Sequence, residues 1–211
     1  MGRGKFITFE GPDGGGKSTQ AGLLAVGLEG RGLEVVLTRE PGGSTGAEDI
    51  RGLLVTGEVG RWRPMSEALL NYAARFEHVE ATVYPALDAG RWVISDRFAD
   101  STLAYQGYGH GLDREIIARL HRLVCGGFRP DLTLILDITV EDGLRRSAER
   151  KGDEDRFERM GLDFHERLRA GFLEIADREV ERCAVIDASK DLETVERQVR
   201  KIVSSRLGVD I

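Results

Sequence analysis

The chain has 211 residues, of which 41% are hydrophobic and 31% charged, a composition typical of a globular protein with one packed core. A net charge of −6 and a pI near 5.4 give no general attraction to nucleic acid or to an anionic membrane. No apolar run has the roughly 18 residues of a membrane span, and the first residues lack a signal-peptide pattern. Two distant cysteines indicate buried free thiols. We therefore expect a single cytoplasmic domain over 1–211.

Short apolar runs predict strands at 5–10, 34–38, 91–95, 132–138 and 183–187. The segments between them predict helices at about 17–30, 45–55, 65–89, 98–105, 113–126, 140–151, 158–180 and 191–207. Strands that are apolar along their length and alternate with helices are typical of a parallel sheet covered on both faces. The pattern therefore predicts a doubly wound α/β fold with right-handed crossovers. Such folds bind ligands at the carboxyl ends of the strands.

A glycine-rich loop follows the first predicted strand. Residues 11–19 read GPDGGGKST and fit G-x-x-x-x-G-K-[ST], a loop whose backbone N–H groups surround phosphate. We expect Lys17 to reach the β- and γ-phosphates and Ser18 to bind Mg²⁺. A plain glycine-rich turn is the alternative, but the strand before the loop and the helix after it favour a nucleotide site. The predicted ATP-binding residues are Gly11, Pro12, Asp13, Gly14, Gly15, Gly16, Lys17, Ser18 and Thr19.

The motif SDRF at 95–98 follows the third predicted strand. The Asp96 carboxylate can hold Mg²⁺ beside Ser18, directly or through water. The Arg97 guanidinium, which follows it, is suited to fork onto a phosphate. An ordinary surface pair at a strand end is the alternative, although the preceding phosphate loop favours the functional interpretation.

The motif TREPGGSTG at 38–46 follows the second predicted strand. It contributes Arg39, and the helix after it contributes Arg51; both arginines could meet the phosphate of an acceptor molecule. The segment also has the composition of a turn that leads into a helix. The two interpretations are compatible.

The segment 142–159 reads DGLRRSAERKGDEDRFER and carries a high density of both charges. A solvated helix end with ion pairs is one interpretation. Phosphoryl transfer, however, needs positive charge over the migrating group and exclusion of water. An arginine-bearing mobile lid provides both. Because the other phosphate motifs are present, we expect a small lid at about 142–157.

Together these motifs resemble those of the bacterial thymidylate kinases, P-loop nucleoside monophosphate kinases that convert dTMP to dTDP with ATP. The matching segments run along nearly the whole chain: FEGPDGGGKST at 9–19, TREPGGS at 38–44, AEDIRGLL at 47–54, YAAR at 72–75, SDRF at 95–98, AYQG at 104–107, PDLTLILD at 130–137, DRFE at 155–158 and IDAS at 186–189. The resemblance implies a five-stranded parallel sheet in the order 2-3-1-4-5. It also implies a homodimer, Mg²⁺-ATP as donor and dTMP as acceptor.

The resemblance implies roles for residues around the nucleoside. Asp13 resembles the acidic residue that meets the dTMP sugar hydroxyl and helps to organise Mg²⁺. Arg75 resembles the arginine that contacts the thymine carbonyl, and Thr102 and Gln106 stand where the family places polar contacts to the base. Tyr105 resembles the aromatic residue under the sugar that disfavours a ribose 2′-hydroxyl.

Arginines form the second set of implied roles. Arg97, with Arg39 or Arg51, resembles the group that holds the dTMP phosphate. Some members carry a basic residue inside the phosphate loop, where this chain has Gly14. The chain therefore resembles members whose catalytic arginines lie in the lid. The candidates, in order of preference, are Arg150, Arg146 and Arg156.

One position departs from the family pattern. Four residues before Arg75, many members place a phenylalanine that stacks on thymine, but this chain has Asn71, with Tyr72 beside it. A base–aromatic stack contributes roughly 1–3 kcal/mol. Either Tyr72 or another aromatic side chain substitutes for the phenylalanine, or the protein binds the base more weakly.

The expected mechanism is positioning and charge stabilisation by Lys17, Arg97 and Mg²⁺, because the acceptor phosphate is already anionic and needs no strong base. Three alternatives stay open. The acceptor could be dUMP or UMP. A P-loop switch or motor would need a positioned water, and the chain lacks the guanine-reading motif N-K-x-D. A binding module without turnover would not need the phosphoryl-transfer residues that are present.

Overall fold

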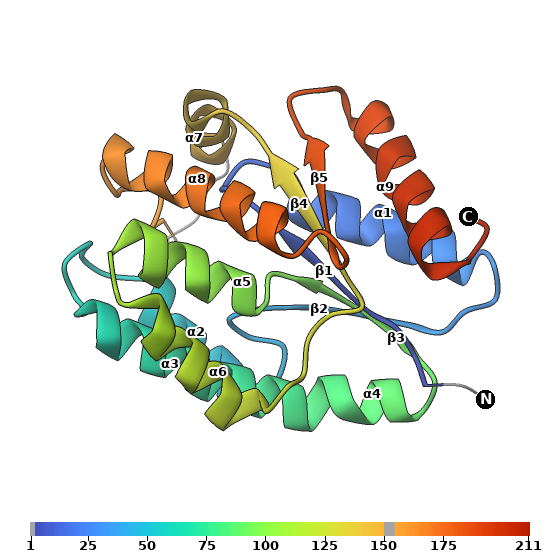
Figure 1. Cartoon of the computed structure of the whole chain (residues 1–211), viewed down its shortest axis with the longest axis horizontal. Coiled ribbons are helices and arrows are strands. Elements are labelled where there is room, and N and C mark those ends of the chain that lie inside the picture. Colours follow the sequence, from blue (N-terminus) through green and yellow to red (C-terminus); the bar gives the residue numbers. More distant parts are fainter. Residues whose placement is uncertain (1–2, 150–154) are drawn as a thin grey trace.

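The computed structural model describes residues 3–149 and 155–211. Within these residues, parallel strands form one sheet in the order β2-β3-β1-β4-β5, which confirms the predicted fold and strand order (Figure 1). The strands are β1 (Phe6–Glu10), β2 (Val35–Arg39), β3 (Trp92–Asp96), β4 (Leu132–Asp137) and β5 (Cys183–Asp187). Each lies within a residue of the predicted run.

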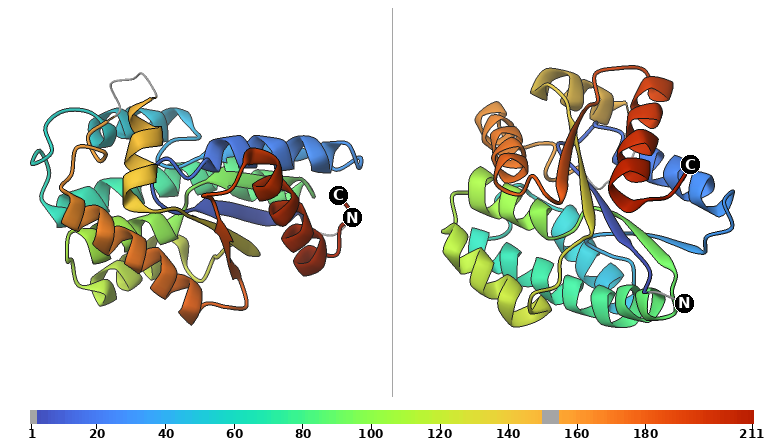
Figure 2. Two further views of the ribbon diagram at one scale, coloured as in Figure 1. Left: turned by 90° about the horizontal axis from the view of Figure 1, so that it is seen from above. Right: turned by 45° about the vertical axis from the view of Figure 1, so that its right-hand side comes forward.

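Helices cover both faces of the sheet, as Figures 1 and 2 show. Helices α1 and α9 lie on one face, whereas α4, α5 and α8 pack on the other. The helices are α1 (Lys17–Glu29), α2 (Thr45–Val55), α3 (Pro64–His78), α4 (Tyr84–Asp88), α5 (Ala99–Thr102), α6 (Arg114–Cys125), α7 (Val140–Ala148), α8 (Leu162–Arg178) and α9 (Leu192–Leu207). Two π-helical segments, η1 (Val79–Val83) and η2 (Leu103–Gly109), continue α3 and α5.

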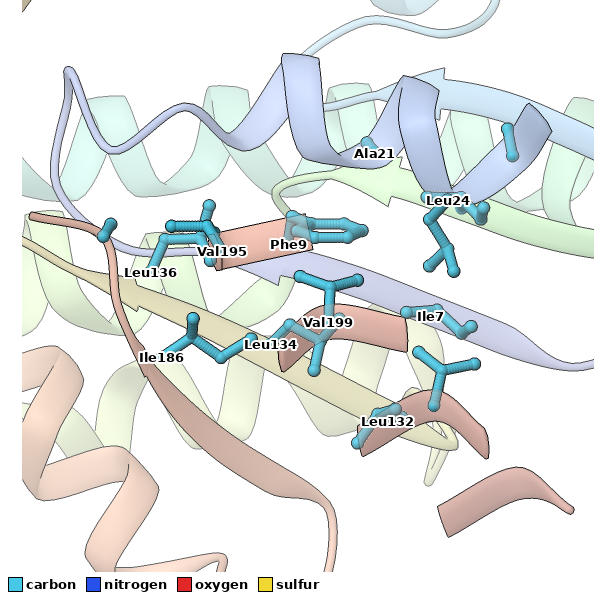
Figure 3. Packing of buried hydrophobic residues seen from close by; sticks show 14 of the residues in the cluster. Ile7, Phe9, Ala21, Leu24, Leu132, Leu134, Leu136, Ile186, Val195 and Val199 are labelled. Carbon is cyan, nitrogen blue, oxygen red and sulfur yellow. The ribbon is translucent and has the colours of Figure 1, made fainter. Parts of the chain in front are cut away.

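The alternation of side chains along the strands builds two apolar layers. On the first face, Ile7 and Phe9 of β1 lie with Leu134 of β4 beneath Leu24 of α1 and Val199 of α9, as Figure 3 shows. The other face carries further apolar clusters under α4 and α8. Burying a side chain of this size contributes about 1.5–3 kcal/mol. These contacts fix the sheet and therefore the loops at its carboxyl edge.

Three helix predictions were wrong at a boundary. The predicted helix over 140–151 ends at Ala148, and residues 150 and 151 lie outside the described residues. The predicted helix over 98–105 continues to Gly109 because a π-helical turn extends it. The predicted helix over 158–180 begins only at Leu162, since the residues before it form turns in which Met160 N donates to Phe157 O. The segments at Gly109 and Leu162 lie near the cavities described below. A π-helical segment such as η2 is frequent at functional sites of proteins.

Two further expectations concern the molecule as a whole. Cys125 and Cys183 are free and buried, as predicted. Among the helices of residues 3–149 and 155–211, none combines the length and the apolarity needed to cross a bilayer.

Candidate active site

The loops after β1, β2 and β3 meet at the carboxyl edge of the sheet. Arg97 N donates to Phe9 O and Glu40 N donates to Asp96 O, each at 2.9 Å, so neighbouring loops are tied together. A cavity of about 420 Å³ opens here, which we call the loop cavity; it is lined by Gly14, Gly16, Lys17, Ser18, Thr19, Arg39, Asp96 and Arg146. A smaller cavity of about 120 Å³, the inner pocket, is lined by Pro41, Val55, Asn71, Ser101, Thr102, Tyr105, Gln106 and Phe157. Both cavities are also lined by Asp13, Glu40, Arg51, Arg97 and Glu158.

The glycine-rich loop needs glycine for its backbone shape. The φ angles of Gly11, Gly14 and Gly16 are +122°, +79° and +84°, values that side chains disfavour. A Cβ on Gly14 would also overlap the carbonyl of Gly143, so the loop lies directly against α7. Helix α1 begins at Lys17 without a side-chain cap, which leaves its first N–H groups for a ligand. The loop therefore has the backbone shape and the uncapped helix start that an anion site requires.

Lys17 is folded back onto the loop. Its Nζ donates to the carbonyl oxygens of Gly11 (3.1 Å) and Pro12 (2.7 Å), and lies 3.9 Å from Asp13 Oδ1. Burial, followed by the nearby Arg97 charge, lowers the pKa of Lys17 to about 8. Its donors are thus satisfied by loop carbonyls at the place where phosphate oxygens are expected.

Ser18 and Asp96 meet at the rim of the loop cavity, where the Ser18 hydroxyl donates to Asp96 Oδ2. Among the described residues, no group of three or more His, Cys, Asp or Glu side chains could hold a metal by itself. Mg²⁺ keeps several waters and takes one or two protein oxygens together with phosphate oxygens. A hydroxyl and a carboxylate at the end of a phosphate loop fit that requirement.

Asp13 and Arg97 form a charged cluster with Tyr105 between the two cavities. Arg97 Nη2 lies 2.5 Å from Asp13 Oδ1 and donates to Tyr105 Oη at 2.9 Å, and the tyrosine hydroxyl donates to Asp13 Oδ2 at 2.8 Å. Burial alone would raise the pKa of Asp13, but the charges of Arg97 and Lys17 outweigh it and hold that pKa well below its usual range. Asp13 is therefore ionised and Arg97 is neutralised by it.

Arg39 and Arg51 reach the loop cavity from β2 and α2. Arg39 Nη2 pairs with Glu48 Oε2 at 3.0 Å, and Glu48 also accepts from Gly43 N. Arg51 Nη1 donates to Pro41 O at 2.8 Å and lines both cavities. The structure thus brings these two arginines to the same edge as Arg97, as the sequence predicted.

Arg75 is only 2% exposed and does not itself line the inner pocket, but it contacts two residues that do, Glu40 and Thr102. Its Nε donates to Glu40 Oε2 (2.8 Å), and its Nη2 donates to Phe98 O (3.1 Å) and Thr102 Oγ1 (3.0 Å). The remaining nitrogen, Nη1, is buried and has no hydrogen-bond partner in the described residues. A buried unpaired donor of a charged group is costly, which favours a ligand oxygen as its missing partner.

Gln106 is oriented by a buried carboxylate. Its Nε2 donates to Glu67 Oε1 at 2.7 Å, while Glu67 Oε2 accepts from both terminal nitrogens of Arg156. His110 Nε2 lies 3.4 Å from Glu67 Oε1. Because an ionised carboxylate only accepts hydrogen bonds, the amide nitrogen of Gln106 must face it. The amide oxygen is left for the inner pocket, since no described residue donates to it.

One predicted contact, Tyr72, lies elsewhere. Tyr72 is 2% exposed, and its hydroxyl donates to Ile117 O at 3.3 Å, away from the inner pocket. Adjacent helical residues point in different directions, so Asn71 lines the pocket whereas Tyr72 does not. Phe157 is an aromatic residue of the pocket that the sequence reasoning missed. The motif DRFE contained it, but nothing in the pattern placed its ring there.

The three lid arginines have different surroundings. Arg146 lines the loop cavity, and its Nη1 donates to Ala188 O at 2.9 Å. Arg156 is fully buried against Glu67 and does not line the loop cavity. The first candidate, Arg150, lies outside the described residues.

Comparison with known proteins identifies the family. Residues 9–199 match the family model described as thymidylate kinase. The thymidylate kinase of Caulobacter vibrioides is 54% identical over 99% of this chain and 100% of its own length, and that of Ruegeria pomeroyi is 51% identical over 98% of each. The crystal structure of thymidylate kinase from Ehrlichia chaffeensis superposes with a TM-score of 0.78 at 40% identity, covering 96% of this chain and 99% of that one. This chain belongs to the thymidylate kinase family.

Proposed function

We propose that the chain transfers the terminal phosphoryl group of ATP to dTMP and releases dTDP and ADP, a step in dTTP synthesis. The observation that carries this proposal is that the loop cavity and the inner pocket share Asp13, Arg51 and Arg97. A nucleotide on the glycine-rich loop and a nucleotide in the inner pocket would therefore present their phosphates to one set of charges. Family membership supports the same reaction.

ATP is placed with its phosphates on the backbone of residues 11–19. Lys17 would exchange its hydrogen bonds to the carbonyls of Gly11 and Pro12 for bonds to β- and γ-phosphate oxygens. Ser18 and Asp96 would hold Mg²⁺, which supplies charge neutralisation on the same oxygens. Arg146 lines the same cavity, with its Nη1 on the Ala188 carbonyl.

The acceptor phosphate is placed against Arg97, with Arg51 and Arg39 on its other sides. Its oxygen is already anionic at neutral pH, so attack on the γ-phosphorus needs alignment rather than proton removal. Asp13 holds Arg97 in position by a charge-assisted hydrogen bond. The chemistry assigned to these residues is positioning and stabilisation of negative charge.

Thymine is read in the inner pocket by opposite hydrogen-bonding groups. The oxygen of Gln106 accepts from the N3–H of thymine, and the unpaired Arg75 Nη1 donates to a ring carbonyl. Cytosine presents an acceptor at N3 and is disfavoured. The Tyr105 ring, held at its hydroxyl by Asp13 and Arg97, disfavours a ribose 2′-hydroxyl.

A small lid completes the proposed domain organisation, which is one P-loop kinase domain over 1–211. Its span of about 142–157 begins in α7, whose Gly143 touches the phosphate loop. It ends at Arg156 and Phe157, which pack beside the inner pocket. Arg150 and Arg146 are proposed to stabilise the migrating phosphoryl group when the lid closes.

A homodimer is supported by an apolar stripe on α3. Met65, Leu69 and Phe76 are 39%, 49% and 48% exposed, and Leu123 of the adjacent α6 is 82% exposed. The three residues of α3 follow one another along one side of the helix, and an exposed apolar stripe of this kind is typical of a protein interface. We place the enzyme in the cytoplasm, where ATP is available and the free thiols stay reduced.

A coupled assay of ADP release with Mg²⁺-ATP tests the proposal, with dTMP, dUMP, UMP, dCMP, AMP and no acceptor as parallel samples. We expect turnover dominated by dTMP. Turnover with several pyrimidine nucleotides would support the kinase assignment but overturn the assignment of thymine as the preferred base. Asn71 would then be the residue to change. ADP release that ignores every acceptor would overturn the kinase assignment and leave an NTPase.

A further inference from the structure

Glu10, the last residue of β1, has no part in the mechanism described above. Its side chain is fully buried directly beneath the turn that carries Arg97. Burying a carboxylate is unfavourable unless hydrogen bonds compensate it. Its contacts therefore indicate what it stabilises.

Every hydrogen bond of the Glu10 carboxylate goes to the segment that follows Arg97. Oε1 accepts from Phe98 N at 2.7 Å and from Ser101 N at 3.2 Å, and Oε2 accepts from the Ser101 hydroxyl at 2.6 Å. The same Ser101 oxygen accepts from Arg97 Nη1 at 3.0 Å. A continuous chain of hydrogen bonds thus runs from Glu10 through Ser101 to the Arg97 guanidinium.

The backbone of Arg97 needs such support. It is the one non-glycine residue of the described chain with a positive φ, at +74°. A left-handed conformation is disfavoured for a residue with a side chain and persists only where neighbouring contacts enforce it. On the carbonyl side, the Ser95 hydroxyl donates to Arg97 O at 2.7 Å. On the following residue, the contact from Phe98 N to Glu10 supplies the corresponding restraint.

We propose that Glu10 is a positioning residue for Arg97: it fixes the turn at 97–101 and, through the Ser101 hydroxyl, aims the guanidinium at the acceptor phosphate. This rests on the proposed function, because it concerns the arginine assigned to the dTMP phosphate. Arg97 faces Asp13 on one side and Ser101 on the other. When a phosphate competes for the Asp13 side, the Glu10–Ser101 side keeps the guanidinium in place.

The test compares Glu10→Gln, Ser101→Ala and the double variant with the wild type in the coupled assay, measuring KM for dTMP, KM for ATP, kcat and Tm. Glutamine retains an acceptor for the two backbone N–H groups but presents an NH₂ group to Ser101. We expect each single variant to raise KM for dTMP at least about tenfold, a loss typical of a misdirected charge-assisted hydrogen bond, while KM for ATP changes less than about twofold. The KM for dTMP of the double variant should be no higher than that of the more impaired single variant, because both substitutions interrupt the same chain of hydrogen bonds.

Asp100→Asn is the matched control. Asp100 lies in the same turn, but its carboxylate pairs with Arg182 at 2.7 and 2.8 Å rather than with Arg97. This variant should lower Tm and leave KM for dTMP unchanged. If Glu10→Gln also lowers Tm and leaves KM for dTMP unchanged, Glu10 only stabilises the fold and the proposal is wrong.

Ser101→Ala keeps the proposal testable even where Glu10→Gln fails to fold, because it removes only a hydroxyl. An unchanged KM for dTMP in Ser101→Ala would also overturn the proposed chain. Failure of the proposed function itself would be seen separately, as absence of dTMP-dependent turnover in the wild type.

Discussion

The loop cavity and the inner pocket adjoin each other but are built in different ways. The loop cavity takes the largest single contribution to its lining from one short stretch, residues 13–19, whose backbone shape is dictated by glycine. The inner pocket gathers single side chains from α2, α3, α5, η2 and the turn before α8. A site formed by backbone groups is encoded by consecutive residues, whereas a site formed by side chains depends on residues that are distant in sequence. Phosphate binding should therefore fail sharply on single substitutions, and base selectivity should change by smaller steps.

The largest effect is expected at the charges that both cavities use. Lys17→Ala and Arg97→Ala should each lower kcat/KM at least about a hundredfold, because each removes a charge that faces the transferring phosphoryl group. Steady-state kinetics with a parallel measurement of Tm separates this loss from unfolding. Lys5→Ala, which removes an exposed ion pair with Asp131 at the opposite end of β1, is the control and should be nearly neutral. Near-normal turnover in either active-site variant would remove that residue from the mechanism.

The pH dependence of ATP binding sharpens the role of Lys17. Its pKa in the free protein is lowered to about 8, and phosphate favours the protonated form, so binding should take up a proton above that pH. The Kd for ATP should rise about tenfold per pH unit as pH increases beyond about 8. Calorimetry in buffers of different ionisation enthalpy measures this uptake directly.

Glu10 supplies the control for that measurement. Burial, with the nearby Asp100, raises the pKa of Glu10 to about 8, so it titrates in the same range. In Glu10→Gln the pH dependence of ATP binding should persist. Loss of this pH dependence in the variant would show that Glu10, rather than Lys17, takes up the proton.

Base selectivity should respond to the residue that orients Gln106. Glu67→Gln allows either end of the Gln106 amide to face residue 67, so the preference for dTMP over dCMP should fall about tenfold, the equivalent of one hydrogen bond. The ratio of the two kcat/KM values is the measurement. His110→Gln, which alters a neighbour of Glu67 that does not line the pocket, should leave the ratio unchanged. An unaltered ratio in folded Glu67→Gln would show that Glu67 only stabilises the fold.

The smallest effect is expected at Asn71, whose side chain lines the inner pocket. Asn71→Phe should lower KM for dTMP about fivefold, near the lower limit of a base–aromatic stack. Asn71→Leu is the matched apolar control and should not reproduce the gain. If KM does not change, a ring at this position does not stack on the base.

The sequence predicted the sheet and the loop cavity well, because both depend on local pattern. Apolar runs located the strands, and consecutive glycines located the loop that lines the loop cavity. It also named Arg75, Gln106 and Tyr105, but only through the family resemblance. The buried carboxylates that hold Arg75 and Gln106, which are Glu40 and Glu67, escaped prediction.

The reason is that a buried ion pair leaves no local signal. Glu67 and Arg156 are separated by 89 residues and look like any charged residues of a helix and a polar segment. Tyr72 shows the opposite error: adjacency to Asn71 suggested that it could replace the stacking ring. On a helix the next residue turns by about 100°, which sends Tyr72 toward α6.

The Asp13–Arg97 pair has a consequence for inhibitor chemistry. Under the proposed function, an uncharged thymine compound would fill the inner pocket while this pair stays intact, whereas dTMP would bring a dianion that competes with Asp13 for the guanidinium. Binding of the neutral compound should therefore be nearly independent of ionic strength, and binding of dTMP should weaken as salt screens the exchange. The Asp13–Arg97 pair therefore permits competitive inhibitors that carry no phosphate group.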